Sequence, residues 1–255
     1  IGGLNISCAI TVCMTLVPQS IPELLKQRTA EHPDKIFLIS EADKRQFTYR
    51  EFEAVVGRVA GLLAANHVQE GDVVSLLLPN SVEYVIAYFA CWHIGALAGP
   101  INSLLKAQEI AYVISDSESK LLLVASEFAS RIENGDFIVF DNVEEVQAEP
   151  IDAARIDSDD EAIIIYTSGT TGKPKGCLLT HGNVIANARQ ISSWLGFTQT
   201  DRLLTIMPLF HMNAVSVTTM SALYAGGSTV VSPKFSASRF WQIISDYQIT
   251  SFGSV

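Results

Sequence analysis

The sequence predicts an α/β fold of layered, largely parallel sheets flanked by helices. Short apolar strands alternate with helical segments along most of the chain, as they do in crossover units. Residues 76–78, 121–124 and 163–165 are continuously apolar, as parallel strands covered on both faces are. The 255 residues are 48% hydrophobic, which is enough material for a large buried core.

Two capping boxes predict where the first helices begin. Ser20 with Glu23 and Thr48 with Glu51 each pair a hydroxyl with a carboxylate three residues later, and the helices are expected to reach about residues 30 and 66. A strand is predicted between them, at 36–40. The later predicted elements are strands at 73–78, 96–101, 120–125, 137–140, 163–166, 177–180, 202–207, 228–232 and from 249, and helices from 81, from 108, through 225 and over 236–247.

We expect three segments along the chain. Residues 1–17 form an apolar extension without Lys or Arg, and because a signal peptide begins with basic residues, the part before Met14 is expected to be non-native. Residues 18–150 are predicted to form a first α/β sub-domain. Residues 151–255 are predicted to begin a second, truncated sub-domain, joined through the acidic stretch 141–161 as a surface connection between two sub-sheets.

Composition excludes several classes of partner. A net charge of -10 argues against nucleic acid, which needs a concentrated basic face. Four scattered cysteines without a C-x-x-C pair indicate neither a zinc site nor a disulfide framework. The longest apolar run, 82–101, contains Glu83, His93 and Pro100, so a buried helix leading into a strand is expected rather than a transmembrane segment. The expected location is the cytoplasm.

One loop carries recognisable chemistry, at residues 166–176 (YTSGTTGKPKG). Its glycines allow backbone N–H groups to approach an anion, its hydroxyls donate to phosphate oxygens, and Lys173 or Lys175 supplies positive charge. The loop is not a Walker A motif, because the glycine spacing differs and Pro174 follows Lys173. It is predicted to join two strands. The candidate ATP-binding residues are Thr167, Ser168, Gly169, Thr170, Thr171, Gly172 and Lys175.

This loop closely resembles the phosphate-loop signature of the adenylate-forming (AMP-binding) superfamily, which includes acyl-CoA synthetases. Residues 179–184 (LTHGNV) and 207–211 (MPLFH) resemble the next family motifs, and the resemblance covers about 20–255. Residues 235–241 and 247–250 are similar to crotonobetaine/carnitine-CoA ligases. The resemblance implies the N-terminal domain of an adenylate-forming enzyme, without the small C-terminal domain.

By this resemblance, the full-length protein is expected to be an acid-thiol ligase of fatty acid or carnitine metabolism. ATP, Mg²⁺ and coenzyme A would act on a small carboxylic acid through an acyl-adenylate. The family's later glutamate, aspartate and lysine motifs are absent, so no catalytic residue is identifiable and the chain alone is expected to be inactive. His211 is assigned to substrate gating. His93 and the apolar positions Val215, Met220 and Leu223 are expected in the core.

Two other classes of function stay open. One is a non-catalytic nucleotide-binding or interaction protein that ends at Val255, and the other is a different adenylating enzyme, such as a peptide-synthetase adenylation domain or a luciferase-like protein. A small phosphate-loop NTPase is disfavoured by the glycine spacing. The oligomeric state and the particular carboxylic acid are not predicted.

Overall fold

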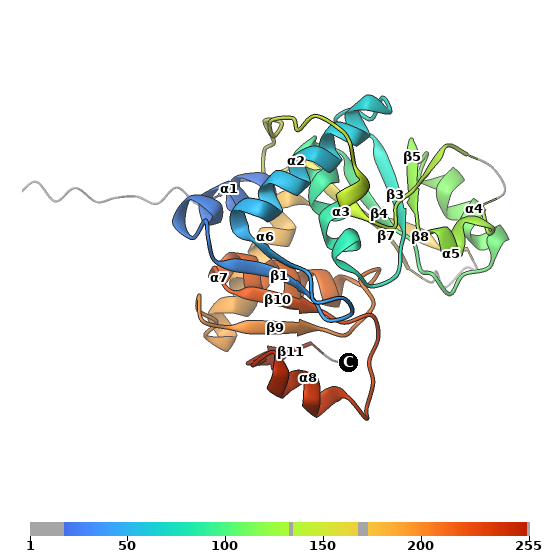
Figure 1. The fold of residues 1–255 in the computed structure, drawn as a ribbon. Helices are drawn as coiled ribbons and strands as arrows, with labels where there is room; N and C mark the ends of the chain where they lie inside the picture. Colours follow the sequence, from blue (N-terminus) through green and yellow to red (C-terminus); the bar gives the residue numbers. More distant parts are fainter. Residues whose placement is uncertain (1–17, 133–134, 168–172, 254–255) are drawn as a thin grey trace, which may run out of the picture.

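The computed structural model describes residues 18–132, 135–167 and 173–253. Within them the strands form two sheets, with orders β11-β9-β10-β1-β2 and β6-β5-β3-β4-β7-β8 (Figure 1). The strands of the first sheet are β1 (Ile36–Ser40), β2 (Gln46–Thr48), β9 (Arg202–Thr205), β10 (Ser228–Val231) and β11 (Ser251–Phe252). Those of the second are β3 (Val73–Leu77), β4 (Leu97–Pro100), β5 (Leu121–Val124), β6 (Phe137–Val139), β7 (Glu161–Thr167) and β8 (Lys175–Thr180).

The helices begin largely where their capping residues predict. Ser20 accepts a hydrogen bond from the Glu23 amide, and the capping box of Thr48 and Glu51 is complete. The α-helices are α1 (Ile21–Glu31), α2 (Tyr49–Ala65), α3 (Val82–His93), α4 (Ala107–Asp116), α5 (Ser126–Ala129), α6 (His181–Leu195), α7 (Ser221–Ala225) and α8 (Phe240–Asp246). A 3₁₀ turn, η1 (Val143–Glu145), and a π-helix, η2 (Ala214–Met220), complete the set.

Both sheets are parallel except at one edge each, as the sequence predicts. In the first sheet β1, β10, β9 and β11 run parallel, and β2 pairs antiparallel with β1. In the second sheet β6, β5, β3, β4 and β7 are parallel, and β8 pairs antiparallel with β7. The carboxyl ends of the parallel strands are therefore available as a ligand-binding edge.

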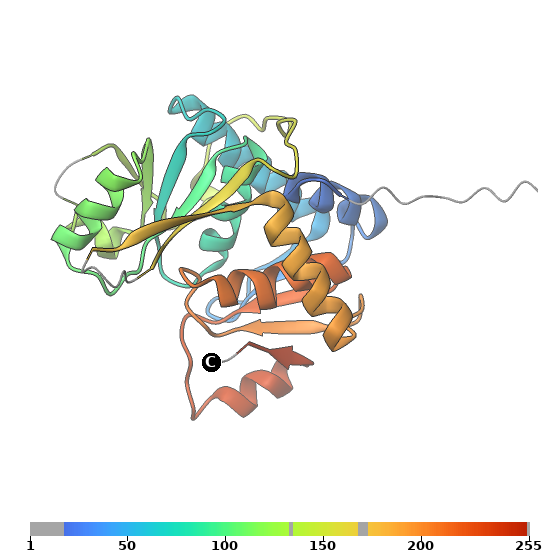
Figure 2. The same cartoon turned by 180° about the vertical axis from the view of Figure 1, so that it is seen from behind.

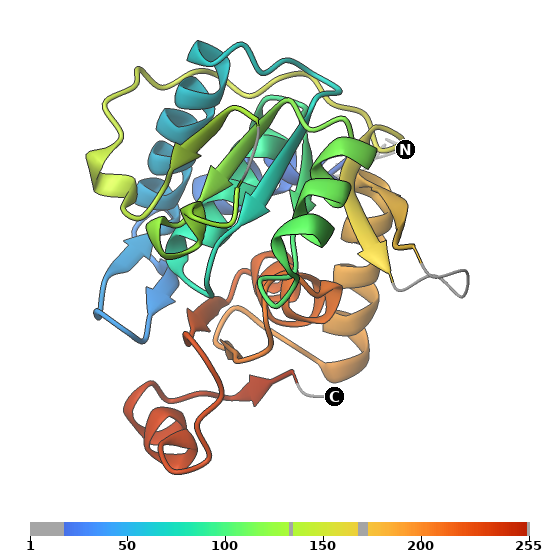
Figure 3. The same cartoon turned by 90° about the vertical axis from the view of Figure 1, so that its right-hand side faces the viewer.

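A layer of helices separates the two sheets. Every residue of α3 is buried, as expected for a helix that is apolar on all sides. This helix contacts β1 of the first sheet and β3 and β4 of the second, and α1 and α2 pack beside it (Figures 1 and 3). Phe37, Phe52, Phe89 and Trp92 form a chain of ring contacts at the centre of this layer.

The other face of the first sheet has a smaller core under α8. Neighbouring residues point to opposite faces, so Leu38 and Leu203 join the main core while Ile39 and Leu204 pack with Ile243 of α8. Figure 2 shows this helix on the outer side of the sheet, away from α6 and α7. The first sheet is thus covered on both faces, as its parallel strands require.

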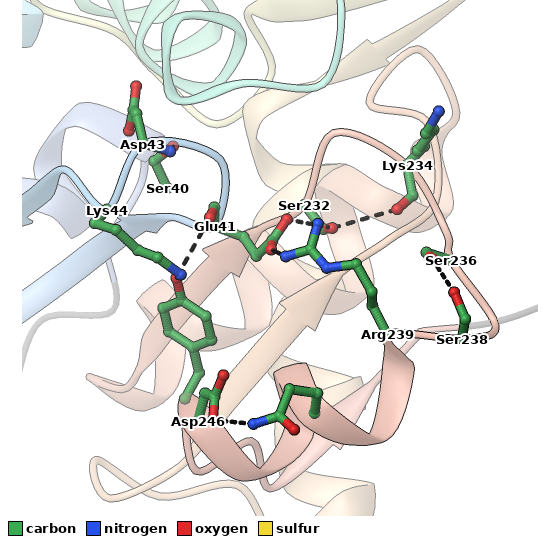
Figure 4. A network of polar contacts seen from close by, with 12 residues as sticks. Ser40, Glu41, Asp43, Lys44, Ser232, Lys234, Ser236, Ser238, Arg239 and Asp246 are labelled. Atoms are coloured by element: carbon green, nitrogen blue, oxygen red, sulfur yellow. Dashed lines mark hydrogen bonds and ion pairs between the residues drawn. The ribbon is translucent and has the colours of Figure 1, made fainter.

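A buried carboxylate fixes the segment that leads into α8. Glu41 is only 3% exposed, and its carboxylate forms an ion pair with Arg239 and accepts a hydrogen bond from Ser232 Oγ at 3.2 Å (Figure 4). Lys44 Nζ donates to Tyr247 Oη at 2.5 Å from the same turn. A buried charge needs a partner. The partner of Glu41 is Arg239, directly before α8, so this network joins the end of β1 to α8.

Several predicted details differ from the structure. In β7, Ile163 is buried but Ile164 and Ile165 are only partly so, because β7 and β8 continue as a hairpin beyond the covered part of the sheet. The stretch 141–161 joins β6 to β7 within one sheet, so it is not a connection between two sheets. It packs on α2 and α3, where the Ala154 amide donates to the His93 carbonyl at 2.8 Å.

Each sheet takes strands from both sides of residue 150, so segments 18–150 and 151–255 do not coincide with the two sheets. The division into sub-domains remains a prediction. Helix α6 was not predicted, because its capping box uses Asn183 in place of glutamate and its second residue is Gly182. Helix α8 is shorter than the predicted 236–247. Residues 1–17, including Met14, lie outside the described residues.

Among the described residues, no helix combines the length and the apolar character needed to cross a membrane.

Candidate functional site

The phosphate-loop motif lies at the end of a two-stranded hairpin. Strands β7 and β8 pair antiparallel from Glu161 with Thr180 to Thr167 with Lys175, so the predicted strand-to-strand loop is confirmed. The candidates Ser168, Gly169, Thr170, Thr171 and Gly172 lie outside the described residues. Thr167 and Lys175 form the last pair of the ladder, and both are exposed.

The two lysines of the motif have different surroundings. The ammonium of Lys173 lies 5.3 Å from the centroid of the Tyr112 ring on α4, a cation–π contact. Lys175 begins β8 opposite Thr167 and is exposed. The sequence analysis names Lys175 as the candidate phosphate ligand, and in the structure the other lysine, Lys173, has an aromatic partner.

The second motif, 207–211, follows β9 as a tight turn. The His211 amide donates to the Pro208 carbonyl at 2.9 Å, and the His211 carbonyl accepts from the Ala214 amide at 3.1 Å. The His211 ring is exposed and contacts the Phe210 ring, with centroids 4.4 Å apart. This turn therefore presents an imidazole at the carboxyl end of a parallel strand.

Asn80 holds this turn in place, and the sequence reasoning missed it. Its Oδ1 accepts from the Leu209 amide at 2.8 Å, and its Nδ2 donates to the carbonyls of Met207 and Ser232 at 2.9 and 3.3 Å. The Tyr88 hydroxyl also donates to the Leu209 carbonyl, at 2.9 Å. The available signal was a polar residue three positions after an apolar strand, at the edge where ligands bind.

A cavity of about 550 Å³ brings the two motifs together. Thr167 and Pro174, from the ends of the phosphate loop, line it together with Phe210 and His211 of the second motif. The lining is largely apolar and consists of Pro100, Ile101, Asn102, Leu105, Glu109, Val113, Ile165, Tyr166, Thr167, Pro174, Phe210 and His211. Its volume is in the range typical of small-molecule sites. Lys175 is not among the lining residues.

A second cavity, of about 420 Å³, lies at the opposite end of the first sheet. Arg202 and Ser228, which begin β9 and β10, line it together with Lys35. The ammonium of Lys35 already donates to the carbonyls of Gln199 and Gly226. Since ligands of parallel α/β sheets bind at the carboxyl ends of the strands, the cavity beside Thr167 is the better candidate.

The remaining predicted residues belong to the core. His93 is buried and its Nε2 lies 2.8 Å from the Ile151 carbonyl, which confirms a satisfied core histidine. Val215, Met220 and Leu223 are buried and do not line the cavity beside Thr167, so core packing is confirmed for them as well. Cys91 is buried and Cys177 exposed, and both are free thiols; Cys8 and Cys13 lie outside the described residues.

Comparison with known families gives the identity. The model of the AMP-binding enzyme family matches residues 25–255. The chain belongs to this family. The long-chain-fatty-acid–CoA ligase FadD13 of Mycobacterium tuberculosis is 32% identical in an alignment of 252 residues, gaps included, that covers 93% of this chain and 50% of the relative. A crotonobetaine/carnitine–CoA ligase of Citrobacter koseri is 33% identical in an alignment of 239 residues, gaps included, that covers 84% of this chain and 46% of the relative.

Solved structures of the AMP-binding family share the fold. The N-terminal domain of FACL13 from Mycobacterium tuberculosis superposes with a TM-score of 0.83 at 31% identity, covering 92% of this chain and 63% of that one. The o-succinylbenzoate–CoA synthetase MenE of Bacillus subtilis, in complex with ATP and magnesium ion, gives 0.83 at 34% identity, covering 90% and 62%. This chain has the α/β fold of the N-terminal domain of adenylate-forming enzymes, and it spans about half the length of the curated relatives it matches.

Proposed function

We propose that this chain is part of an ATP-dependent carboxylate–CoA ligase. The observation that carries the proposal is the largely apolar cavity that Thr167, at the end of the phosphate loop, lines together with His211. A site that joins an acyl group to a nucleotide needs both a polar end and an apolar wall. The relatives that are named as CoA ligases of long-chain fatty acids, o-succinylbenzoate and crotonobetaine support this chemistry.

The reaction would proceed in two substitutions. A carboxylate oxygen attacks the α-phosphorus of ATP, the bond from that phosphorus to the bridging oxygen breaks, and pyrophosphate leaves. The thiolate sulfur of coenzyme A then attacks the acyl carbon, and AMP leaves with the electrons of the broken C–O bond. The substrate we propose is a small or medium organic acid in fatty acid or carnitine metabolism, and coenzyme A is proposed over a carrier-protein thiol.

The site residues predicted from the sequence have defined parts in this proposal. Thr167, Lys175 and the residues between them would hold the β- and γ-phosphates and stabilise the charge of the leaving pyrophosphate. Lys175 is proposed as the charged ligand, because the ammonium of Lys173 already contacts the Tyr112 ring. His211 would gate the acyl side of the cavity.

Magnesium would enter with the nucleotide. The described residues contain no group of three or more His, Cys, Asp or Glu side chains that could hold a metal ion. Protein sites for Mg²⁺ often supply one or two carboxylates and take the other ligands from substrate phosphates and water. The ion would offset phosphate charge during the first substitution.

Calorimetric titration with ATP tests the phosphate-loop assignment. Lys175→Ala is expected to weaken ATP binding by about tenfold, because a charge-assisted hydrogen bond to phosphate is lost. Lys120→Ala is the matched control, since Lys120 is exposed on the amino-terminal side of β5 and far in sequence from the loop. Equal affinities of the two variants would contradict the assignment.

Exchange of radioactive pyrophosphate into ATP tests the ligase itself. We expect no carboxylate-dependent exchange by the 255 residues alone, and measurable exchange by a polypeptide of the relatives' length that contains them. The reason is that the family's glutamate, aspartate and lysine motifs are absent from this sequence. Exchange by the 255 residues would refute the predicted inactivity, and ATP binding without exchange by the longer polypeptide would favour a nucleotide-binding role.

A further inference from the structure

Helix α4 holds both ends of the phosphate loop through one pair of side chains. Tyr112 and Asp116 are four residues apart and so lie on the same face of the helix. Asp116 Oδ2 accepts a hydrogen bond from the Tyr166 hydroxyl at 2.7 Å, and its Oδ1 accepts from the Tyr112 hydroxyl at 3.0 Å. One exposed carboxylate therefore joins α4 to the last part of β7.

Tyr112 makes the corresponding contacts on the other side of the loop. Its single hydroxyl hydrogen can go to the Pro174 carbonyl, 3.3 Å away, in place of Asp116, and its ring lies under the Lys173 ammonium, 5.3 Å from the centroid. Tyr166 precedes Thr167 on β7, and Pro174 precedes Lys175 on β8. The last pair of the β7–β8 ladder is Thr167 with Lys175. The two side chains of α4 thus contact the residue before each member of this pair, Tyr166 and Pro174.

Core packing involves the partly buried Tyr112 but does not explain why Asp116 is a carboxylate bonded to the hairpin. Ile110 and Val113 form the buried face of α4, whereas Asp116 is exposed. An exposed hydrogen-bonded carboxylate contributes little to global stability. Burial raises the pKa of Tyr166, and the hydrogen bond to Asp116 and its charge raise it further, so the phenol remains a donor to this carboxylate.

The charge of Asp116 is unfavourable beside a site for polyphosphate. A carboxylate near the loop repels phosphate, and its removal by itself would strengthen ATP binding slightly. If the side chain positions the loop, its removal has the opposite effect. The direction of the change in affinity therefore separates these two roles.

We propose that Asp116 and Tyr112 are positioning residues that fix the two ends of the phosphate loop, and hence the separation and direction of Thr167 and Lys175. This inference rests on the proposed function, in which Thr167 and Lys175 contact the phosphates. The pair acts through Tyr166 on one side and through Lys173 and Pro174 on the other.

The test compares Asp116→Ala with Glu127→Ala in the 255-residue chain. Glu127 is an exposed carboxylate on α5, so its substitution removes the same charge without touching the hairpin. Calorimetry with ATP is expected to give a dissociation constant raised about five- to tenfold by Asp116→Ala and unchanged by Glu127→Ala. Asp116→Asn, which keeps one acceptor oxygen, is expected to recover part of the loss.

Amide hydrogen exchange gives a second readout that needs no ATP. Asp116→Ala is expected to speed exchange of Tyr166 and Gly176, which pair near the loop, and to leave Ile163 and Leu179 at the far end of the ladder unchanged. Tighter ATP binding by Asp116→Ala, or unchanged exchange at Gly176, would overturn the inference. If the unsubstituted chain binds no ATP, the proposed function fails, and the exchange data still decide whether Asp116 orders this end of the hairpin.

Discussion

His181 is the residue whose surroundings differ most from what its motif implies. It is fully buried at the start of α6, and its Nδ1 accepts a hydrogen bond from the Ile21 amide at 3.3 Å. Ile21 is 160 positions away along the chain, so no local pattern in the sequence indicates this partner. Burial lowers the pKa of His181 to about 4, and the nearby charge of Asp160 only partly opposes this shift.

The contribution of His181 to the free energy of unfolding is therefore expected to decrease as the pH is lowered. The unfolded chain takes up a proton near pH 6.5 and the folded chain only near pH 4, so the contribution is complete above about pH 6.5 and is lost as the pH falls to 4. The full difference is about 3 kcal/mol. Urea unfolding between pH 4 and 7.5 measures it.

His181→Asn is expected to remove this pH dependence, because an amide oxygen can still accept from Ile21 but does not titrate. His67→Asn is the control, since His67 is exposed and its φ of 63° is one that Asn tolerates. A pH profile that keeps its slope in His181→Asn would show that other groups cause the acid destabilisation.

At the scale of elements, the connection from β6 to β7 depends on a close approach to α2. A Cβ built on Gly61 would lie 2.0 Å from the Glu149 carbonyl oxygen, whereas a Cβ on Gly57 would lie 3.5 Å from its nearest neighbours, Pro150 and Ile151. The two glycines are one helical turn apart and face the same segment. Gly61 alone is needed for this packing.

We expect Gly57→Ala and Gly61→Ala to change stability in opposite directions. Alanine is favoured over glycine inside a helix by about 1 kcal/mol, so Gly57→Ala is expected to be neutral or stabilising. Gly61→Ala forces backbone apart and is expected to cost about 1–3 kcal/mol. Thermal and urea unfolding of both variants give the comparison, and equal stabilities would mean that the 141–161 segment shifts freely on α2.

At the scale of the molecule, Asn80 links the two sheets beside the candidate site. It follows β3 of one sheet and bonds to Met207, Leu209 and Ser232, which follow β9 and β10 of the other. If the Asn80 side chain were removed, the Leu209 amide and the carbonyls of Met207 and Ser232 would all lose this hydrogen-bond partner. The geometry of the cavity beside Thr167 therefore depends on this contact.

Asn80→Ala is expected to lower the free energy of unfolding by about 1–3 kcal/mol, since the Leu209 amide loses its acceptor. Faster amide exchange is expected at Leu209 and not in β5. Asn66→Ala is the control, because Asn66 Nδ2 donates only to Leu62 within its own helix end. If the two variants lose the same stability, Asn80 is an ordinary surface cap and does not join the sheets.

The sequence by itself determined the order of most strands, the starts of α1 to α4 and the phosphate-loop motif. These features depend on neighbours in the chain: Ser20 caps with Glu23, Thr48 with Glu51, and strand-forming runs have their own apolar pattern. The loop at 167–175 was found because its chemistry lies in consecutive residues.

Only the tertiary structure decided which distant residues share a site. Strand order places β1 beside β10 and β4 beside β7, and no local pattern encodes such pairing. Consequently the contacts of Asn80, Tyr112 and Asp116 with the two motifs follow from the packing of α3 and α4 and cannot be predicted from the sequence. Contacts between residues far apart in sequence depend on the packing of whole faces, whereas caps and loops depend on their nearest neighbours.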